Sequence, residues 1–217
     1  MLATAGALLA SEGWAAGVSD ADAASGIRAA LERGAGAAVD QLGRTDGFLG
    51  NPKVKIPLPG YLKDASKLAR LTGQQKQVDD LVTAMNRAAE AAVPEARTLL
   101  VSAVKSMSVD DARRVVTGGD DWVTKFFASK TRKPLGEKFL PIVTRETEKV
   151  ELAAHFNAVA GKAALMGLMK GDDASIERYV TGKALDGLYF MIAEEEKKIR
   201  RDPIGTGSAL LAKVFGK

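Results

Sequence analysis

The chain has 217 residues, 46% hydrophobic and 27% charged, which is enough to bury one sizeable core and too apolar for a disordered protein. Its 31 basic and 27 acidic residues give a net charge of +4, and the basic residues are spread out, so nucleic acid is not an expected partner. The absence of cysteine excludes thiol catalysis, cysteine-ligated zinc and disulfides, and a single histidine, His155, leaves few metal or triad chemistries. We therefore expect no cofactor.

Residues 1–18 contain an apolar run, Leu2–Ala10, followed by small residues at Gly13, Ala15 and Ala16. This pattern is typical of a secretory signal cleaved after Ala15 or Ala16, and the run is too short to span a bilayer. The basic residues that begin most signals are missing, which a true start upstream of Met1 would explain. The signal predicts a periplasmic protein. The alternative is a short apolar helix packed on the rest of the chain, in a cytoplasmic protein.

From Ser19 onward, apolar residues recur at helical spacing, and no stretch alternates long enough to be a central strand. Ser19 and Asp22 resemble a capping box that opens a first helix, which Gly43 ends. Further helices are predicted, in chain order, over Val78–Ala92, from Pro94 to Met107, over Ser108–Thr117, over Trp122–Phe127, from Pro134 to Val150, over Leu152–Met169, over Asp173–Ile199 and over Leu210–Phe215. A kink or break is expected at Pro141. The predicted fold is all-α, a single-domain bundle of about eight or nine helices over residues 19–217.

Gly47–Lys63 reads GFLGNPKVKIPLPGYLK, and its glycines and prolines forbid a helix and exclude a central strand. Residues 44–60 are therefore predicted to form a long extended connector, here called the strap. Within it the apolar Val54, Ile56 and Leu58 alternate with other residues, so that one edge of the strap is apolar.

The strap has two interpretations. In the first, its apolar edge covers the core between helices while the lysines stay in water. In the second, the strap binds a ligand: Lys53 and Lys55, helped by Lys63, Lys67 and Arg70, meet an anionic ligand or a lipid headgroup. Spacing alone does not choose between them.

Polar residues interrupt two apolar helix faces. Asn86, Arg87 and Glu90 lie within the Val78–Ala92 helix, and Lys183 and Asp186 share a face of a late helix, where the acid interrupts an apolar series. Arg87 is expected to reach across to Lys183 or Asp186, and a half-buried aspartate there needs a partner. The favoured interpretation is a structural salt-bridge network, and the alternative is a catalytic or ligand-binding site.

Acidic pairs offer a candidate cation site at Asp110–Asp111 and Asp120–Asp121. They lack the spacing of a helix–loop–helix calcium loop, and acids are favoured at helix N-termini, so capping is expected and no metal site is predicted. The run EEEKKIRR predicts a solvated helix face on which Glu194 faces Lys198 and Glu196 faces Arg200.

Four segments in order, GFLGNPKVKIPLP, VDDLVTAMNRAAEAAVPEA, MSVDDARRVVTGGDDWVTKFF and VTGKALDGLYFMIAEEEKKIRRDP, resemble an uncharacterised bacterial family, the domain of unknown function 4197. The resemblance runs from about Ser19 to Phe215. It implies an all-helical single domain, usually made with an export signal. It implies no activity, and therefore no catalytic residue.

The sequence contains none of the common nucleotide-binding or hydrolase motifs. We therefore expect a non-enzymatic, exported protein of the cell envelope that binds a protein partner or an apolar or anionic ligand. One alternative is a periplasmic, hydrolase-like enzyme built on carboxylates, which needs Asn86, Arg87, Glu90 and Asp186 to converge in an open cleft. The other is a self-associating structural envelope protein, which needs a broad exposed apolar face.

Overall fold

The structure, a computed structural model, describes residues 19–62, 71, 73, 75–119, 122–151, 153–154, 157 and 175–201. Within these residues it has no β-strand and six α-helices: α1 Asp20–Gly43, α3 Gln75–Ala92, α4 Ala96–Lys105, α5 Val109–Thr117, α6 Trp122–Thr147 and α8 Ile176–Arg201. Two single 3-10 turns, Gly60–Leu62 and Val93–Glu95, join them. The all-α prediction is confirmed.

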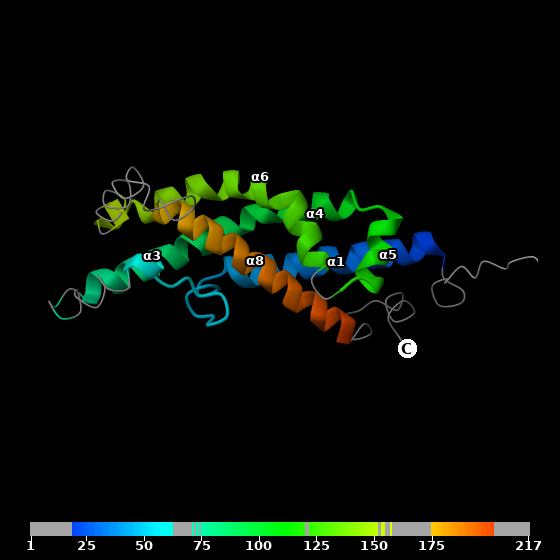
Figure 1. The fold of residues 1–217 in the computed structure, drawn as a ribbon, viewed down its shortest axis with the longest axis horizontal. Coiled ribbons are helices and arrows are strands. Elements are labelled where there is room, and N and C mark those ends of the chain that lie inside the picture. The colour runs from blue at the N-terminus through cyan, green and yellow to red at the C-terminus, as the bar shows by residue number, and fades with distance from the viewer. Residues whose placement is uncertain are drawn as a thin grey trace, which may run out of the picture.

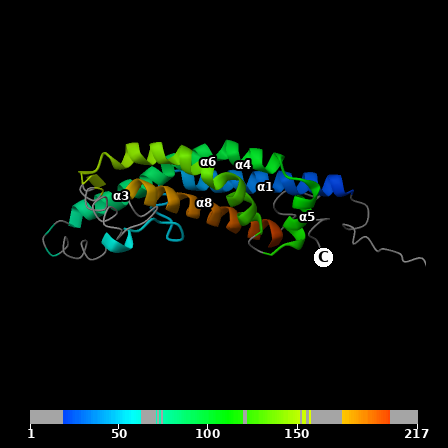
Figure 2. The same cartoon turned by 45° about the horizontal axis from the view of Figure 1, so that its top comes forward.

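The molecule is elongated, and its long helices α1, α3, α6 and α8 run roughly along its length (Figure 1). Helix α6 packs against both α3 and α8, and α1 packs against α8 and α4. The short helix α5 lies near the beginning of α1 in both views (Figure 2). Buried side chains from all these helices form one hydrophobic cluster, with Phe48, Phe127 and Phe139 among its largest fully buried members.

Helix α1 follows its sequence signals closely. Ser19 caps it by accepting the backbone N–H of Asp22, and the helix ends at Gly43 as predicted. Its buried face is rich in alanine and glycine, and small side chains allow neighbouring helices to approach closely. Helix α5 also begins as predicted, with a capping box formed by Ser108 and Asp111.

Helix α6 corrects the sequence analysis. Pro134 and Pro141 both lie inside one continuous helix, so Pro134 does not begin a new helix and Pro141 does not break it. A proline frees the carbonyl four residues earlier, and here those residues, Lys130 and Glu137, are exposed, so water can bind the freed carbonyls. Fully buried side chains around both prolines hold the helix on the core. The described chain therefore has six α-helices, fewer than the number expected.

The strap is non-helical through Pro59, as predicted, but its first half is not one extended segment. Its first half is a series of turns, with backbone hydrogen bonds such as Gly50 N–H to Asp46 O (3.1 Å) and Lys55 N–H to Asn51 O (2.8 Å). From Lys55 to Pro59 no regular element is assigned. Within the turns of the first half, Asp46 adopts a positive φ of 64°, and Gly47 follows it.

The strap covers the core, as the first interpretation predicted. Val54 and Ile56 are buried, Leu58 is partly buried against the core, and Lys53 and Lys55 are exposed.

Several predictions fall outside the described residues: the apolar segment 1–18, Lys63, Lys67, Arg70, the Asp120–Asp121 pair, His155, most of the helix predicted over 152–169, and the C-terminal helix over 210–215. Among the helices that are described, none is both long and apolar enough to cross a bilayer.

Candidate functional site

Asn86 clamps the second half of the strap onto α3. Its side chain is fully buried, and its Oδ1 accepts the backbone N–H of Ile56 at 2.8 Å. Its Nδ2 donates to Ile56 O at 2.9 Å and to Val82 O at 2.8 Å. The amide thus satisfies both polar groups of a buried strap residue, much as a neighbouring β-strand would. Asn86 is thus a polar side chain on an apolar helix face that serves to hold the backbone of the strap at Ile56.

Glu90 clamps the first half of the strap one helical turn later. Its Oε1 accepts the backbone N–H groups of Phe48 and Leu49, each at 3.0 Å, and its Oε2 accepts from Arg87 at 2.6 Å. Arg87 also donates to Asp46 at 2.8 Å. Hydrogen bonds to Glu90 and Asp46 raise the pKa of Arg87. The buried carboxylate of Glu90 is therefore neutralised and fully used by structural contacts.

This arrangement corrects the pairing expected for Arg87. It does not reach Lys183 or Asp186, because both ends of its guanidinium are held on the α3 side of the strap. Asp46 could not be identified as its partner from the sequence, since the two residues are far apart in the chain and meet only when the strap folds back over α3.

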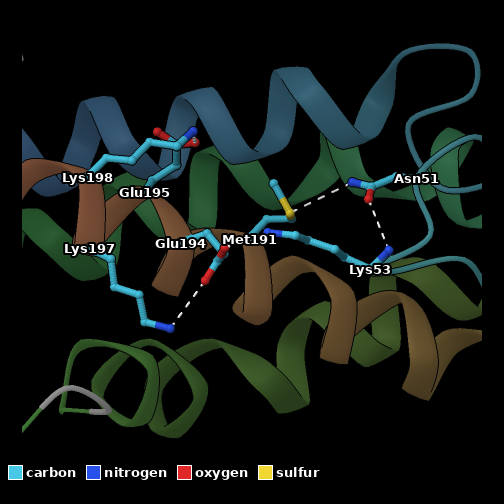
Figure 3. Close-up of polar contacts among 7 residues, drawn as sticks. All are labelled: Asn51, Lys53, Met191, Glu194, Glu195, Lys197 and Lys198. Carbon is cyan, nitrogen blue, oxygen red and sulfur yellow. Dashed lines mark hydrogen bonds and ion pairs between the residues drawn. The ribbon is translucent and has the colours of Figure 1, made fainter.

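Helix α8 holds the other side of the strap. Lys53 Nζ pairs with Glu194 at 2.8 Å, and Asn51 Nδ2 contacts Met191 Sδ at 4.0 Å (Figure 3). Hydrogen bonds from Lys53 and then Lys197 lower the pKa of Glu194. Further along the strap, the Tyr179 hydroxyl donates to Pro57 O at 3.1 Å. The strap is thus fixed to two helices along most of its length.

Figure 3 also shows the charged end of α8. Glu194 pairs with Lys197 at 3.2 Å and Glu195 pairs with Lys198 at 2.6 Å, both with a spacing of three residues. The expected contact between Glu194 and Lys198 is therefore wrong, because Glu194 pairs with Lys53 of the strap and with Lys197. Glu196, which was expected on the same solvated face, is buried.

A groove of about 370 Å³ opens between the strap and α8, and we call it the strap groove. Its lining residues are Lys53, Val54, Lys55, Ile56, Pro57, Lys183, Asp186, Gly187 and Phe190. It brings together Lys53, Lys55, Lys183 and Asp186, which the sequence had singled out separately. Asn86, Arg87 and Glu90 do not line it; they hold the strap from the α3 side.

The charges of the strap groove are unevenly satisfied. Lys53 is paired with Glu194, and Lys183 lies 3.6 Å from Asp186. Lys55 is exposed and forms no ion pair with any residue in the described part of the chain. Phe190 is 39% exposed at the rim, although it belongs to the apolar series of α8. The groove therefore combines an apolar wall with one unpaired cation.

Gly187 explains why the strap can lie so close to α8. A Cβ atom at this position would be 2.7 Å from Cε1 of Phe48 and 3.4 Å from Cβ of Val54. Only a glycine permits this approach. Sequence analysis missed Gly187, whose only signal was a glycine inside an otherwise helical run.

Asp186 is more exposed than expected, with half of its side chain accessible to solvent. Its main partner is Arg132 of α6, at 2.8 Å, which the sequence analysis did not identify. Arg132 also lies over the ring of Tyr189, whose hydroxyl is 2.9 Å from Thr131 Oγ1. Burial raises the pKa of Tyr189. These contacts tie α6 to α8.

Of the acidic pair Asp110–Asp111, Asp111 caps α5, and Asp110 pairs with Arg113 at 3.4 Å. Ser108 donates its backbone N–H to Asp111, and this hydrogen bond lowers the pKa of the carboxyl. No cluster of histidine and carboxylate side chains suited to a metal ion occurs within the described residues.

The fold and this groove define a class: an all-helical protein whose proline-rich strap is pinned between α3 and α8. The family described as "Protein of unknown function (DUF4197)" matches residues 17–216, and the chain belongs to this family. No curated protein and no solved structure matches the chain.

Proposed function

We propose that the protein is a non-enzymatic binding protein of the cell envelope, and that the strap groove holds an anionic ligand with an apolar part. One observation carries this proposal: the groove places Lys55, a cation that pairs with no described residue, beside an apolar wall that includes the exposed ring of Phe190. An anionic group next to a short apolar chain complements both features.

The fixed strap supports binding by a preformed site. Asn86, Glu90 and Tyr179 each hold the strap backbone by hydrogen bonds, so the groove does not have to be organised when the ligand arrives. Preorganisation of this kind improves affinity by reducing the entropy lost on binding.

The two alternative functions have weaker support. A carboxylate enzyme needs Asn86, Glu90 and Asp186 in one cleft, but the first two are engaged with the strap backbone and the third pairs with Arg132. A self-associating protein needs a broad apolar face. Among the described residues, the large apolar side chains with substantial exposure are Leu71 and Phe190, and two side chains are too few for such a face.

Calorimetric titration with octanoate tests the proposal, with octanol as the neutral control. We expect octanoate to bind more tightly than octanol, and Lys53→Ala with Lys55→Ala to weaken octanoate binding by about tenfold. The matched control is Lys105→Ala with Lys138→Ala, which removes the same charge outside the groove. Vesicles containing phosphatidylglycerol, compared with pure phosphatidylcholine, test a lipid surface as the source of the anion. The proposal is contradicted if the wild type binds neither octanoate nor the anionic vesicles, or if the groove variant and the control variant bind octanoate equally well.

Export is part of the same proposal, and the support for it is the apolar run Leu2–Ala10 followed by small residues. When the gene is extended to an upstream basic start, the protein should be recovered from the periplasm with its N-terminus near Ala16 or Gly17. N-terminal sequencing of the periplasmic fraction is the measurement. Uncut protein in the cytoplasm contradicts export.

A further inference from the structure

A second concave site lies between α6 and α8, and it shares no residue with the strap groove. We call it the glycine notch. Its volume is about 270 Å³, and it is lined by Arg132, Lys133, Gly136, Leu140, Arg178, Thr181, Gly182 and Leu185. No residue of the strap lines it.

Two glycines create the notch. A Cβ atom at Gly182 would have no neighbour within 4 Å, and one at Gly136 would meet only Leu185 Cδ1, at 3.9 Å. The two helices pack against each other along this seam, yet at these positions neither has a side chain to fill the space. The glycines are therefore not required by close packing, in contrast to Gly187, and they leave helix backbone open to a bound group.

The charge around the notch is positive. Arg132, Lys133 and Arg178 line it, and no carboxylate does. Arg132 is oriented by Asp186 and lies over the Tyr189 ring. Lys133 and Arg178 are exposed and form no ion pair with other described residues. Cations on a helical surface usually pair with acids three or four residues away, so an unpaired set around a hollow favours an anion.

A buried hydroxyl adds a second, independent signal. Thr181 also lines the notch; the residue is 8% exposed, and its enclosed Oγ1 has no hydrogen-bond partner among the described residues. A buried hydroxyl without a partner is costly, and rotation of this side chain toward the notch would let an oxygen-rich ligand satisfy it.

From these features we infer that the glycine notch binds a phosphate group. A phosphate offers several acceptor oxygens and up to two negative charges, which suit the two guanidinium groups and one ammonium group that line the notch from two helices. The fork of Arg132, already held by Asp186, provides a fixed point for one pair of oxygens. The phosphate belongs to a soluble monoester or to a lipid headgroup, and both sources present the same chemistry.

Calorimetric titration with inorganic phosphate and with glycerol 3-phosphate tests this inference, together with sedimentation on vesicles containing phosphatidic acid. We expect the intact protein to bind at least one of these probes, and binding to fade as salt rises. Lys133→Ala with Arg178→Ala should weaken it by about tenfold or more, since both removed side chains are charged donors. Binding to the soluble probes identifies a free phosphate compound as the source, and binding to the vesicles alone identifies a headgroup.

Two further variants separate the notch from general electrostatics. Gly182→Leu should fill the notch and abolish binding without removing any charge, and the open space there allows the protein to fold. Lys105→Ala with Lys138→Ala removes equal charge outside both sites and should leave phosphate binding unchanged. The notch variants leave the strap groove intact, so either proposal can fail alone. The inference is overturned if no probe binds, or if both notch variants bind like the wild type.

Discussion

Asn86 gives the sharpest test of how the strap is held. Asn86→Ala leaves the buried N–H and C=O of Ile56 without their side-chain partners. Each buried polar group without a partner costs about 1–3 kcal/mol, so the free energy of unfolding should fall by about 2–5 kcal/mol. For a chain of this size that lowers the melting temperature by roughly 5–15 °C. Asn51→Ala, which alters a partly exposed strap residue, should cost less than Asn86→Ala.

Asn86→Asp has nearly the same shape but reverses one hydrogen-bond partner. The oxygen that replaces Nδ2 would face the carbonyls of Ile56 and Val82, which accept from Asn86 at 2.9 and 2.8 Å. Burial and these carbonyls disfavour the carboxylate, so the pKa of the new acid in the folded state should lie above its unfolded value of about 3.9. Stability is then retained below about pH 4, where the acid is protonated and can donate. It is lost as pH rises, by up to about 1.4 kcal/mol per pH unit, until the folded pKa is passed.

Urea unfolding followed by circular dichroism, at several pH values, measures both effects against the wild type. Asn86→Ala should show a loss that does not change with pH, because alanine does not titrate. The reasoning is refuted if Asn86→Ala unfolds within about 0.5 kcal/mol of the wild type, or if the deficit of Asn86→Asp is the same in acid and at neutral pH.

Three further changes test the packing of the strap and of α5. Gly187→Ala should destabilise the protein by about 1–3 kcal/mol, because the added Cβ would overlap Phe48. Gly182→Ala, in open space on the same helix, should be neutral or stabilising by up to about 1 kcal/mol. Thermal melts that rank the two variants in the reverse order contradict the close contact. Ile56→Asp should cost several kcal/mol, on the order of 3 or more, while Ile56→Val should cost about 1 kcal/mol, and equal denaturation midpoints would show that the strap does not cover the core. The hydrogen bond from the Ser108 backbone lowers the pKa of Asp111, so the stability that Asp111 contributes is present above about pH 4 and is lost as pH falls further. Asp111→Asn should flatten this part of the acid unfolding curve. An unchanged curve counts against the cap.

The local elements could be predicted from the sequence because their signals lie within a few residues. Ser19 and Ser108 were identified as helix caps from the acid three residues later, and both caps form. The strap was identified from its glycines and prolines, and the alternation of Val54 and Ile56 with lysines placed its buried edge correctly. Periodicity and steric exclusion are properties of neighbouring residues, so no tertiary information was needed.

The prolines of α6 show the limit of such local rules. A proline weakens a helix by removing one hydrogen bond, but whether the helix breaks depends on how strongly the flanking turns are held. At Pro134 and Pro141 the flanking Leu135, Phe139 and Val143 are fully buried, and this packing keeps the helix continuous. The burial of those residues is set by α3 and α8, which the local pattern does not encode.

Partners across the fold were decided only by the tertiary structure. The sequence showed that Arg87, Lys183 and Asp186 are polar residues on apolar helices. It did not show that Arg87 pairs with Asp46 and Glu90, while the other two line the strap groove. Which charge meets which depends on how distant segments pack, and one such contact is the close approach of the strap to α8 at Gly187. The packing of α6 against α8 leaves Gly136 and Gly182 at an open notch, where Lys133 and Arg178 form no ion pair with other described residues. The chain therefore specifies its helices, caps and strap locally, whereas its candidate binding sites arise from packing between distant segments.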